Sequence, residues 1–468
     1  MNGHTSTNLL AGSLLRVMAA SFNRRPSLRE QMRSNGSWID FSVGVRTEDG
    51  TVEQSIAFKG GRARVSGGVP RGTDVQMIFR DDAVVKEMLS LPPNEVLTLL
   101  LKSGFRLEGN LSYMNLFNYY LSLLLAKKHR KMIAKAKRAD AELRAREAPS
   151  VDAGLSGEMA LRRRERLEAP SVDPGVKYLE EPYLSRYGIE DFPRLQRFLD
   201  IHHSVVPEVC CERPSILTDW FLENGFEVDR EGREWSPVLR QGRAFKHLME
   251  KREPIIRKDD LLAGTTTTSE IGVVVYPDSH GTMIWGELGS VEDRPLNPYR
   301  ISAEARDTFH HKVFPFWSSR NMREWVRENK GAPLSQKLDE RFAVYFMWKT
   351  AALSHTILDF PKLLALGTDG IIAEIESELA RDGGADEEKR DTLRAMIMCL
   401  EGLSAYAANL ANRADADAAA ERDPGRRAEL EELARICRKV PRRPADTLHE
   451  ALNAIWIGWI GLHMESTN

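Results

Sequence analysis

The first part of the chain alternates hydrophobic and polar positions in the manner of short β-strands. Phe41 and Val43 alternate with polar or small residues, the segment Glu48-Asp-Gly50 supplies a turn, and Ile56 and Phe58 resume the alternation. Successive side chains of a strand point to opposite faces, so a period of two predicts one buried face. Together with the turn, the pattern predicts a β-hairpin.

Helical periods flank these strands. Apolar residues recur at helical spacing within residues 8–21, where the expected apolar stripe is Leu10, Leu14, Val17 and Met18. This spacing predicts an amphipathic helix. After a last strand at 105–109, the run from Leu111 to Leu125 predicts an apolar helix. Residues 1–126 are therefore expected to form an α+β domain.

Residues 127–177 break this pattern. Residues 127–147 hold nine Lys or Arg against three Asp or Glu, without Gly or Pro, which predicts a charged helix leaving the first domain. Such a helix serves either as a contact to an anionic membrane or nucleic acid, or as a solvated connection; the second is favoured because no apolar face accompanies the charge. A linker containing Pro and Gly follows.

From residue 178 to residue 468 the periodicity changes to long helices with short apolar strands. The run Val273-Val-Val-Tyr276 is rich in β-branched residues and predicts a buried strand. The most apolar run, Ala454 to Leu462, is too short to span a bilayer and predicts a buried helix.

Composition narrows the class of protein. Sixty-six basic and 68 acidic residues give a net charge of -2, which argues against an overall nucleic-acid footprint. Four cysteines in 468 residues form no disulfide framework. The N-terminus lacks a basic region ahead of an apolar core, so secretion is not expected, and we expect a cytoplasmic protein without a transmembrane segment.

Several motifs between residues 178 and 468 resemble the N-terminal part of the glycyl radical enzyme family, whose best-known member is pyruvate formate-lyase. They are Cys211-Glu-Arg, Pro254-Ile-Ile-Arg-Lys-Asp-Asp-Leu-Leu-Ala-Gly, Gly272-Val-Val-Val-Tyr-Pro-Asp, Asn297-Pro-Tyr-Arg-Ile-Ser, Phe314-Pro-Phe-Trp and Ile436-Cys-Arg-Lys-Val-Pro. The resemblance implies a ten-stranded α/β barrel, of which this chain would hold the helical wrapping and the first part.

The resemblance also implies radical chemistry. In the family, a separate S-adenosylmethionine activase installs a glycyl radical, and a cysteine in a Gly-Cys loop relays it to substrate. None of the cysteines here follows a glycine; they are Cys210, Cys211, Cys399 and Cys437. The segment Arg64-Val-Ser-Gly67 matches most of the family's radical motif but lies in the first domain and is interpreted as a coincidence. We therefore expect no radical, no bound cofactor and no turnover on this chain alone.

Two residues are the candidates for substrate contact. His355 and Asp359 are four residues apart and would share one face of a helix. A matching His-plus-Asp pattern in diol- and amine-cleaving relatives places the histidine near the substrate's oxygen. A buried, hydrogen-bonded core histidine is an equally good interpretation. The histidine pairs His202-His203 and His310-His311 point apart on a strand or helix, so we expect no metal site.

The first domain resembles sterol-carrier-protein-type lipid-binding domains through Asp74-Val-Gln-Met-Ile-Phe and Gly104-Phe-Arg-Leu-Glu-Gly-Asn-Leu. That family encloses an apolar tunnel for acyl chains or sterols. Six inward-facing residues would line such a tunnel or fill a closed core: Phe41, Val43, Phe58, Phe79, Met114 and Phe117. Periodicity identifies inward faces but not a void between them, so both interpretations stay open.

Two functions follow from these resemblances. The first is part of a glycyl radical enzyme that cleaves a C–C or C–X bond, which would need a complementary C-terminal chain. The second is a non-catalytic protein that binds a lipophilic small molecule or acts as a scaffold. A barrel cut partway would leave unpaired strand edges, so self-association is also expected of the isolated chain.

Overall fold

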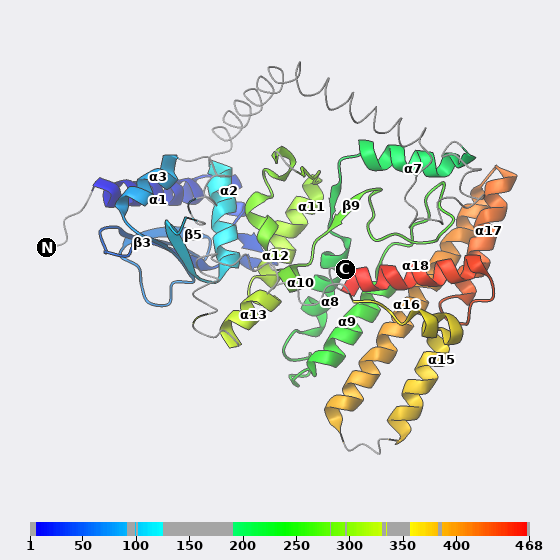
Figure 1. Ribbon diagram of the computed structural model, residues 1–468. Helices are drawn as coiled ribbons and strands as arrows, with labels where there is room; N and C mark the ends of the chain where they lie inside the picture. Colours follow the sequence, from blue (N-terminus) through cyan, green and yellow to red (C-terminus); the bar gives the residue numbers. More distant parts are fainter. Residues whose placement is uncertain are drawn as a thin grey trace, which may run out of the picture. The chain divides into compact units, whose positions relative to one another are not determined.

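The computed structural model describes residues 6–90, 99, 102–124, 191–280, 282–294, 297–329, 334, 356–381 and 386–465 (Figure 1). The expected charged helix and linker at 127–177 and the candidate His355 lie outside the described residues. The chain divides into two compact units, one formed by Met1–Leu121 with Pro207–Asn468 and the other by Ser122–Val206.

The N-lobe, as we call residues 6–121, is built on a five-stranded sheet. Its strands are β3 (Phe41–Thr47), β4 (Glu53–Lys59), β5 (Arg62–Gly67), β6 (Val75–Phe79) and β7 (Phe105–Gly109), in the order β5-β4-β3-β6-β7. The predicted hairpin is confirmed, because β3 and β4 are antiparallel with Phe41 opposite Phe58. Strands β3 and β6 pair in parallel, so the chain crosses over between them.

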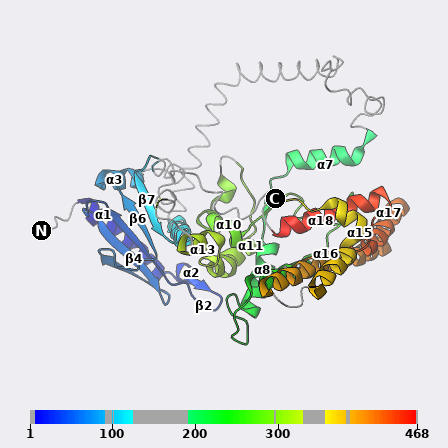
Figure 2. The ribbon, with the colours of Figure 1, turned by 60° about the horizontal axis from the view of Figure 1, so that its bottom comes forward.

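Helices and a small ribbon complete the N-lobe. They are α1 (Ser6–Arg24), α2 (Pro26–Glu30), the two-stranded ribbon β1 (Arg33–Ser34) and β2 (Ser37–Trp38), α3 (Asp82–Ser90) and the helical residues 111–121. Figure 2 shows α1 lying along β4, and α1 also contacts β5. The predicted helices at 8–21 and 111–125 are thus present over their described parts.

The predicted apolar stripe of α1 was wrong in its phase. Leu10, Leu14 and Val17 are 45%, 46% and 62% exposed, whereas Met18 and Phe22 are buried at 1% and 0%. The Phe22 ring lies 5.6 Å from that of Phe58 and 4.6 Å from that of Tyr120. This aromatic contact determines which side of α1 faces the sheet. Because α1 has apolar residues on two of its sides, periodicity alone selected the side that the structure exposes.

Aromatic rings pack closely in the N-lobe core. The six candidate lining residues are all buried: Phe41, Val43, Phe58, Phe79, Met114 and Phe117. The Phe41 and Phe58 rings stack at 4.8 Å, and the Tyr120 ring lies 5.1 Å from Phe58. These contacts fill the space between Phe41, Phe58 and Tyr120, and the lining of a tunnel by the six residues stays a prediction.

The second part of the unit is mainly helical. Its long helices are α8 (Glu212–Asn224), α9 (Pro237–Lys251), α15 (Phe360–Arg381), α16 (Glu387–Ala420), α17 (Pro424–Lys439) and α18 (Leu448–Glu465). Shorter helices between residues 277 and 329 are α10 (Pro277–His280), η5 (Met283–Glu287), η6 (Val291–Asp293), α11 (Ala303–Thr308), the π-helix η7 (Phe309–Val313), α12 (Phe314–Trp317) and α13 (Met322–Asn329). None of the described helices is long and apolar enough to cross a membrane.

Two glycines allow α9 and α16 to cross closely. A Cβ atom on Gly242 would lie 2.9 Å from the Cα atom of Ala395, and one on Gly402 would lie 3.1 Å from the Cα atom of Lys246. Both contacts are to backbone of the facing helix, which cannot move aside as a flexible side chain can. The small residues therefore set the distance between the two helices.

Strand content in this part is small among the described residues. β8 (Glu208–Cys210) pairs in parallel with β9 (Gly272–Val274), and Glu208 also bridges to Arg300. The predicted strand at 273–276 is thus shorter than expected, and its residues Gly272–Val274 are half-buried rather than buried. In the separate unit, α7 (Pro193–Ser204) leaves Leu195 and Phe198 exposed.

Candidate functional site

Two family motifs meet at the C-terminal end of α18. The guanidinium of Arg213 forms two hydrogen bonds of 2.8 Å with the carboxylate of Asp278. Its remaining N–H groups donate to the carbonyls of Met464 at 2.6 Å and Glu465 at 3.0 Å. The hydroxyl of Tyr276 donates to the carbonyl of His463 at 2.6 Å. We call Arg213, Tyr276 and Asp278 the Arg213 clamp.

Local sequence explains how the clamp forms. Arg213 stands in the first turn of α8, and Asp278 stands in the first turn of α10, directly after Pro277. The last carbonyls of a helix lack partners within it, and a cation there also opposes the negative end of the helix dipole. Arg213 is buried at 2%, and its guanidinium lies 4.5 Å from the Tyr276 ring. Burial raises the pKa of Tyr276, so this phenol stays protonated.

A second arginine, Arg252, lies beneath the loop that follows α9. It is 1% exposed, donates to the carbonyl of Thr265 at 2.6 Å and lies 4.7 Å from the ring of Tyr406. Its Nη2 atom is 3.7 Å from the Glu212 carboxylate. Burial raises the pKa of Glu212, and the charge of Arg252 opposes that shift.

The stretch from Pro254 to Gly264 rests on the middle of α18. The backbone N–H of Ala263 donates to Asn453 Oδ1 at 3.0 Å, and Trp456 Nε1 donates to the carbonyl of Gly264 at 2.9 Å. Gly264 has a φ of +99°, and a Cβ atom there would lie 2.9 Å from Ile460. Only glycine accommodates both this backbone conformation and this contact.

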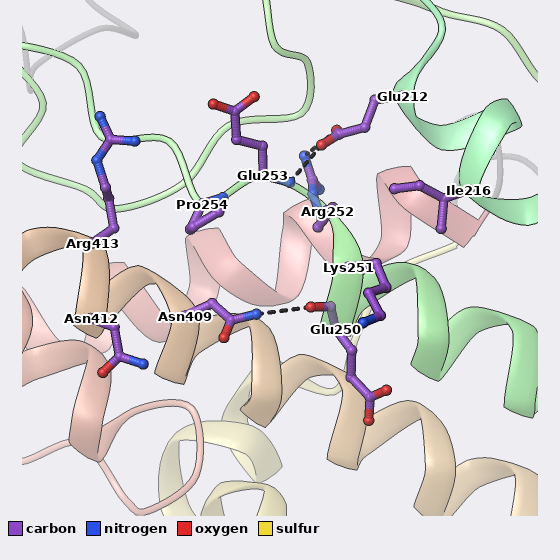
Figure 3. Close-up of a pocket in the computed structure, with 10 residues that line it drawn as sticks. All are labelled: Glu212, Ile216, Glu250, Lys251, Arg252, Glu253, Pro254, Asn409, Asn412 and Arg413. Atoms are coloured by element: carbon purple, nitrogen blue, oxygen red, sulfur yellow. Dashed lines mark hydrogen bonds and ion pairs between the residues drawn. The ribbon is translucent and has the colours of Figure 1, made fainter.

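A groove opens beside Arg252 (Figure 3). Its volume is about 700 Å³, and its walls are Glu212, Ile216, Glu250, Lys251, Arg252, Glu253, Pro254, Asn409, Asn412 and Arg413. Glu212 accepts a hydrogen bond of 2.6 Å from the Glu253 N–H, and Asn409 donates to the Glu250 carbonyl at 3.0 Å. Three carboxylates and three cations stand among these residues, so the groove presents no single sign of charge to a ligand.

Of the two predicted substrate-contact residues, Asp359 is described. It is exposed, and its Oδ1 atom accepts a hydrogen bond of 3.0 Å from the N–H of Lys362 in the first turn of α15. Residues 356–359 precede the helix, so the helical spacing assumed for His355 and Asp359 does not apply there. Asp359 acts as an N-cap in this structure, and its contact with substrate stays a prediction.

The cysteines have the surroundings of packed thiols. Burial raises the pKa of Cys211, raises that of Cys399 to about 11 and raises that of Cys437 to about 12. A thiol with a raised pKa forms little of the reactive thiolate at neutral pH. The segment Arg62–Gly67 that carries the incomplete radical motif is β5, at the edge of the N-lobe sheet.

His310 joins the N-lobe to the helical part and was not foreseen as a contact between them. Trp285 Nε1 donates to His310 Nδ1 at 2.9 Å, so the proton of the neutral ring is on Nε2, which donates to the carbonyl of Gln31 at 2.7 Å. The His310 ring also lies 4.6 Å from that of Tyr119. Burial and the neighbouring His311 lower the pKa of His310 to about 3.

Further hydrogen bonds extend this contact, which we call the lobe seam. Asn110 Nδ2 donates to the carbonyl of Ser318 at 2.9 Å, and the N–H of Leu111 donates to the buried carboxylate of Glu324 at 3.2 Å. The N–H of Asn35 donates to the carbonyl of His311 at 3.1 Å. Among the described residues, no cluster of His, Cys, Asp or Glu has the geometry of a metal site. His310 and His311 each form a hydrogen bond with a backbone carbonyl of the N-lobe, and no sequence period signals such a pairing in advance.

Comparison with known proteins identifies the helical part. The family described as "Pyruvate formate lyase-like" matches residues 190–468. The isethionate sulfite-lyase of Oleidesulfovibrio alaskensis is 28% identical over 279 residues, which cover 56% of this chain and 32% of that protein. The trans-4-hydroxy-L-proline dehydratase of Clostridioides difficile is 25% identical over 286 residues, which cover 58% of this chain and 34% of that protein.

Comparison with solved structures gives the same family of relatives for the helical part. A solved structure from Roseburia inulinivorans, described under the words "1,2-propanediol Dehydration", matches with a TM-score of 0.53. Its sequence is 25% identical, and the match covers 58% of this chain and 32% of that one. The glycerol-bound, B12-independent glycerol dehydratase of Clostridium butyricum shares the fold with a TM-score of 0.53 and 24% identity over 58% of this chain and 34% of that one. The chain therefore spans about a third of the length of the relatives it matches. With its match over more than half of its residues, the chain belongs to the pyruvate formate lyase-like family.

Proposed function

We propose that this chain contributes the helical shell to a glycyl radical enzyme-type assembly that cleaves a C–C or C–X bond, and that it is inactive alone. Its relatives carry the names sulfite-lyase and dehydratase, both of which describe bond-cleaving eliminations. The sequence holds neither a Gly-Cys loop nor the family's C-terminal glycine motif. The catalytic groups would therefore come from other residues of the assembly.

The Arg213 clamp is the observation that carries this proposal. It joins residues of Cys211-Glu-Arg and of Gly272-Val-Val-Val-Tyr-Pro-Asp to the last turn of α18. A buried charge is costly unless it is paired and hydrogen-bonded, and Arg213 is both. The residues of these two motifs are thus joined by hydrogen bonds and an ion pair, as expected if the helical part still serves as the shell of an enzyme.

The outer face of α18 supports a further chain as partner. Leu448, Leu452 and Trp459 are 76%, 45% and 38% exposed along this helix. Exposed apolar side chains that recur along one helix favour a contact with another apolar surface. The remaining part of a family barrel, carried by a complementary chain, is the occupant that fits the proposal.

Electron paramagnetic resonance tests the proposal. The chain is incubated anaerobically with an activase and S-adenosylmethionine, alone and with a chain that carries the Gly-Cys loop and the C-terminal glycine motif. A glycine-centred doublet and turnover are expected only in the mixture. A doublet from this chain alone that disappears in Gly67→Ala would show that Arg64–Gly67 is a radical site and would contradict the proposal.

The substitution His355→Ala then tests substrate contact in the same mixture. Loss of turnover with an unchanged melting temperature supports a contact with substrate. Loss of thermal stability instead identifies a hydrogen-bonded core histidine, because leaving a buried polar network incomplete costs about 1–3 kcal/mol. Asp359→Asn serves as the companion variant, since Asp359 is exposed.

Binding of a lipophilic molecule by the N-lobe is the second candidate function. Its support is the apolar face of the sheet, on which Val43, Ile56 and Val75 are fully buried beneath helices. Titration of the full chain with a fluorescent fatty acid tests this candidate. Saturable binding that Phe58→Trp weakens would favour a tunnel, whereas no saturable signal would favour the closed aromatic core.

A further inference from the structure

The solvent-facing side of α1 carries four large aliphatic side chains. Leu9, Leu10, Leu14 and Val17 are 55%, 45%, 46% and 62% exposed. Leu10, Leu14 and Val17 follow the i, i+4, i+7 spacing and so form one line along the helix, which we call the α1 ridge. Single exposed leucines are ordinary on protein surfaces, but a continuous line of them marks a contact surface.

The opposite side of α1 is fixed to the sheet. Leu15, Met18 and Phe22 are 6%, 1% and 0% exposed, and Asn23 Nδ2 donates to the carbonyl of Ala63 in β5 at 2.8 Å. The N–H of Ala63 donates back to Asn23 Oδ1 at 2.8 Å. The helix therefore cannot turn to bury the α1 ridge without losing these contacts, and the ridge stays available to a partner.

The chain from Ser6 to Arg29 carries charge of one sign, while Asp82 of α3 contacts Thr7 at the N-terminal end of α1 and pairs with Lys86. Between Ser6 and Arg29 the chain has four arginines and no Asp or Glu: Arg16, Arg24, Arg25 and Arg29. All four are exposed, and none forms an ion pair with another residue in the part of the chain that the structure describes. Arg24 lies seven residues after Val17 and continues the line of the ridge. An apolar surface bordered by unpaired cations fits a partner that is both apolar and anionic.

We propose that the α1 ridge docks this protein onto an anionic lipid bilayer. Aliphatic side chains of an amphipathic helix enter the boundary between headgroups and acyl chains, while arginines at its edge contact anionic headgroups. A second copy of the chain is the competing partner. A parallel two-fold pairing of the same ridge would bring the arginines of both copies together, and this repulsion disfavours such a dimer.

Co-sedimentation of the full chain with vesicles tests the proposal. The protein is expected to bind vesicles of phosphatidylcholine mixed with phosphatidylglycerol, to bind pure phosphatidylcholine weakly, and to be released by salt. The variant Leu10→Gln/Leu14→Gln/Val17→Gln replaces exposed side chains with residues that favour helix, so the fold is expected to persist. Its binding should fall by about tenfold or more, since the apolar contact is lost.

Matched variants identify the source of binding. Leu448→Gln/Leu452→Gln removes exposed leucines from α18 and should leave vesicle binding unchanged. Arg16→Gln/Arg24→Gln should weaken binding and reduce its dependence on salt. Circular dichroism and the melting temperature confirm that each variant is folded.

Three results would overturn the proposal. The first is no binding of the folded wild-type chain to anionic vesicles. The second is equal binding by the triple α1 variant, which would locate the contact elsewhere, for example in the basic segment 127–147. The third is a dimer that the triple variant converts to a monomer, because the ridge would then bind a second copy.

Discussion

Different kinds of internal contact stabilise the N-lobe and the helical part. The N-lobe core is made of apolar side chains that alternate along neighbouring strands, such as Val43, Ile56 and Val75. The helical part buries Arg213 and Arg252, which donate hydrogen bonds to the carbonyls of Met464 and Thr265. Apolar contacts are non-directional and tolerate exchange of similar residues, whereas a buried arginine needs each of its partners in place. The helical part should therefore be the more sensitive to single polar substitutions.

The sharpest test of this difference is Arg213→Met. It leaves Asp278 without its partner and frees the carbonyls of Met464 and Glu465, so we expect a loss of about 3–5 kcal/mol in the free energy of unfolding. Urea denaturation of the full chain measures the loss. Hydrogen exchange should show that α18 opens first.

Two controls sharpen this result. Arg233→Ala removes an arginine that is 73% exposed and should leave the unfolding midpoint unchanged. Arg213→Met/Asp278→Leu removes both charges and should be more stable than Arg213→Met alone. If the double variant were the less stable of the two, the cost would come from packing and not from the unpaired carboxylate.

Acid should loosen the lobe seam before it affects the N-lobe core. The pKa of His310 is about 3 in the folded protein, whereas an unfolded histidine titrates near 6.5, so the unfolded chain binds the proton more readily. Stability is full above pH 6.5 and falls as the pH drops toward 3, by about 2 kcal/mol at pH 5. Urea midpoints at pH 8 and pH 5 measure this loss.

The variant His310→Asn checks the assignment. It lacks the titrating ring and should lose less stability than the wild type between pH 8 and pH 5, even if it starts from a lower value. An unchanged pH dependence would mean that another group controls the acid sensitivity. His311 shares the seam, and His311→Asn is the matched variant.

A larger side chain at the crossing of α9 and α16 should destabilise the protein. In Gly242→Ala the new methyl group would lie 2.9 Å from the Ala395 backbone, so the helices must separate, at a cost of about 1–3 kcal/mol. Gly425→Ala is the control, because its nearest neighbour is the Asp423 carboxylate at 3.3 Å. Thermal melts should rank the control at or above the wild type and Gly242→Ala below it.

The smallest effect is expected for Ile56→Val in the N-lobe sheet. The change removes one methyl group from a fully buried side chain, and such changes cost about 0.5–1.5 kcal/mol. A loss as large as that of Arg213→Met would show that the N-lobe core is no more tolerant than the clamp. Thermal and urea unfolding of the same samples give both values.

Sequence periodicity located much of the fold because it reports local geometry. It identified the β3–β4 hairpin and the helices α1 and α18. It misplaced the buried side of α1, since Leu10 and Leu15 are equally apolar and only the rings of the sheet distinguish them. The motif residues Arg213 and Asp278 were recognised by resemblance, but their pairing across 65 positions has no local signature.

The same limit applies to the remaining candidate residues. Asp359 was interpreted as part of a helix, yet it precedes α15 and caps it, a role that its type and the following helix could have indicated. His310 lies in a π-helix, whose wider turn no apolar period marks, and its hydrogen bond with Trp285 joins residues 25 positions apart. The roles of Asp359 and His310 therefore depend on contacts with other segments, which local sequence patterns do not report.

The lobe seam also sets an order of events during synthesis. Its hydrogen bonds join residues 208 positions apart in the pair Asn110 and Ser318, and 279 apart in the pair Gln31 and His310. A ribosome that adds about 5–20 residues per second needs about 10–56 s to bridge these separations. The N-lobe sheet is complete at Gly109, so it can fold while Gln31 and Asn110 wait for their partners. A nascent chain stalled before Trp285 should thus carry a folded sheet with one open side, which is the stage at which a chaperone would bind.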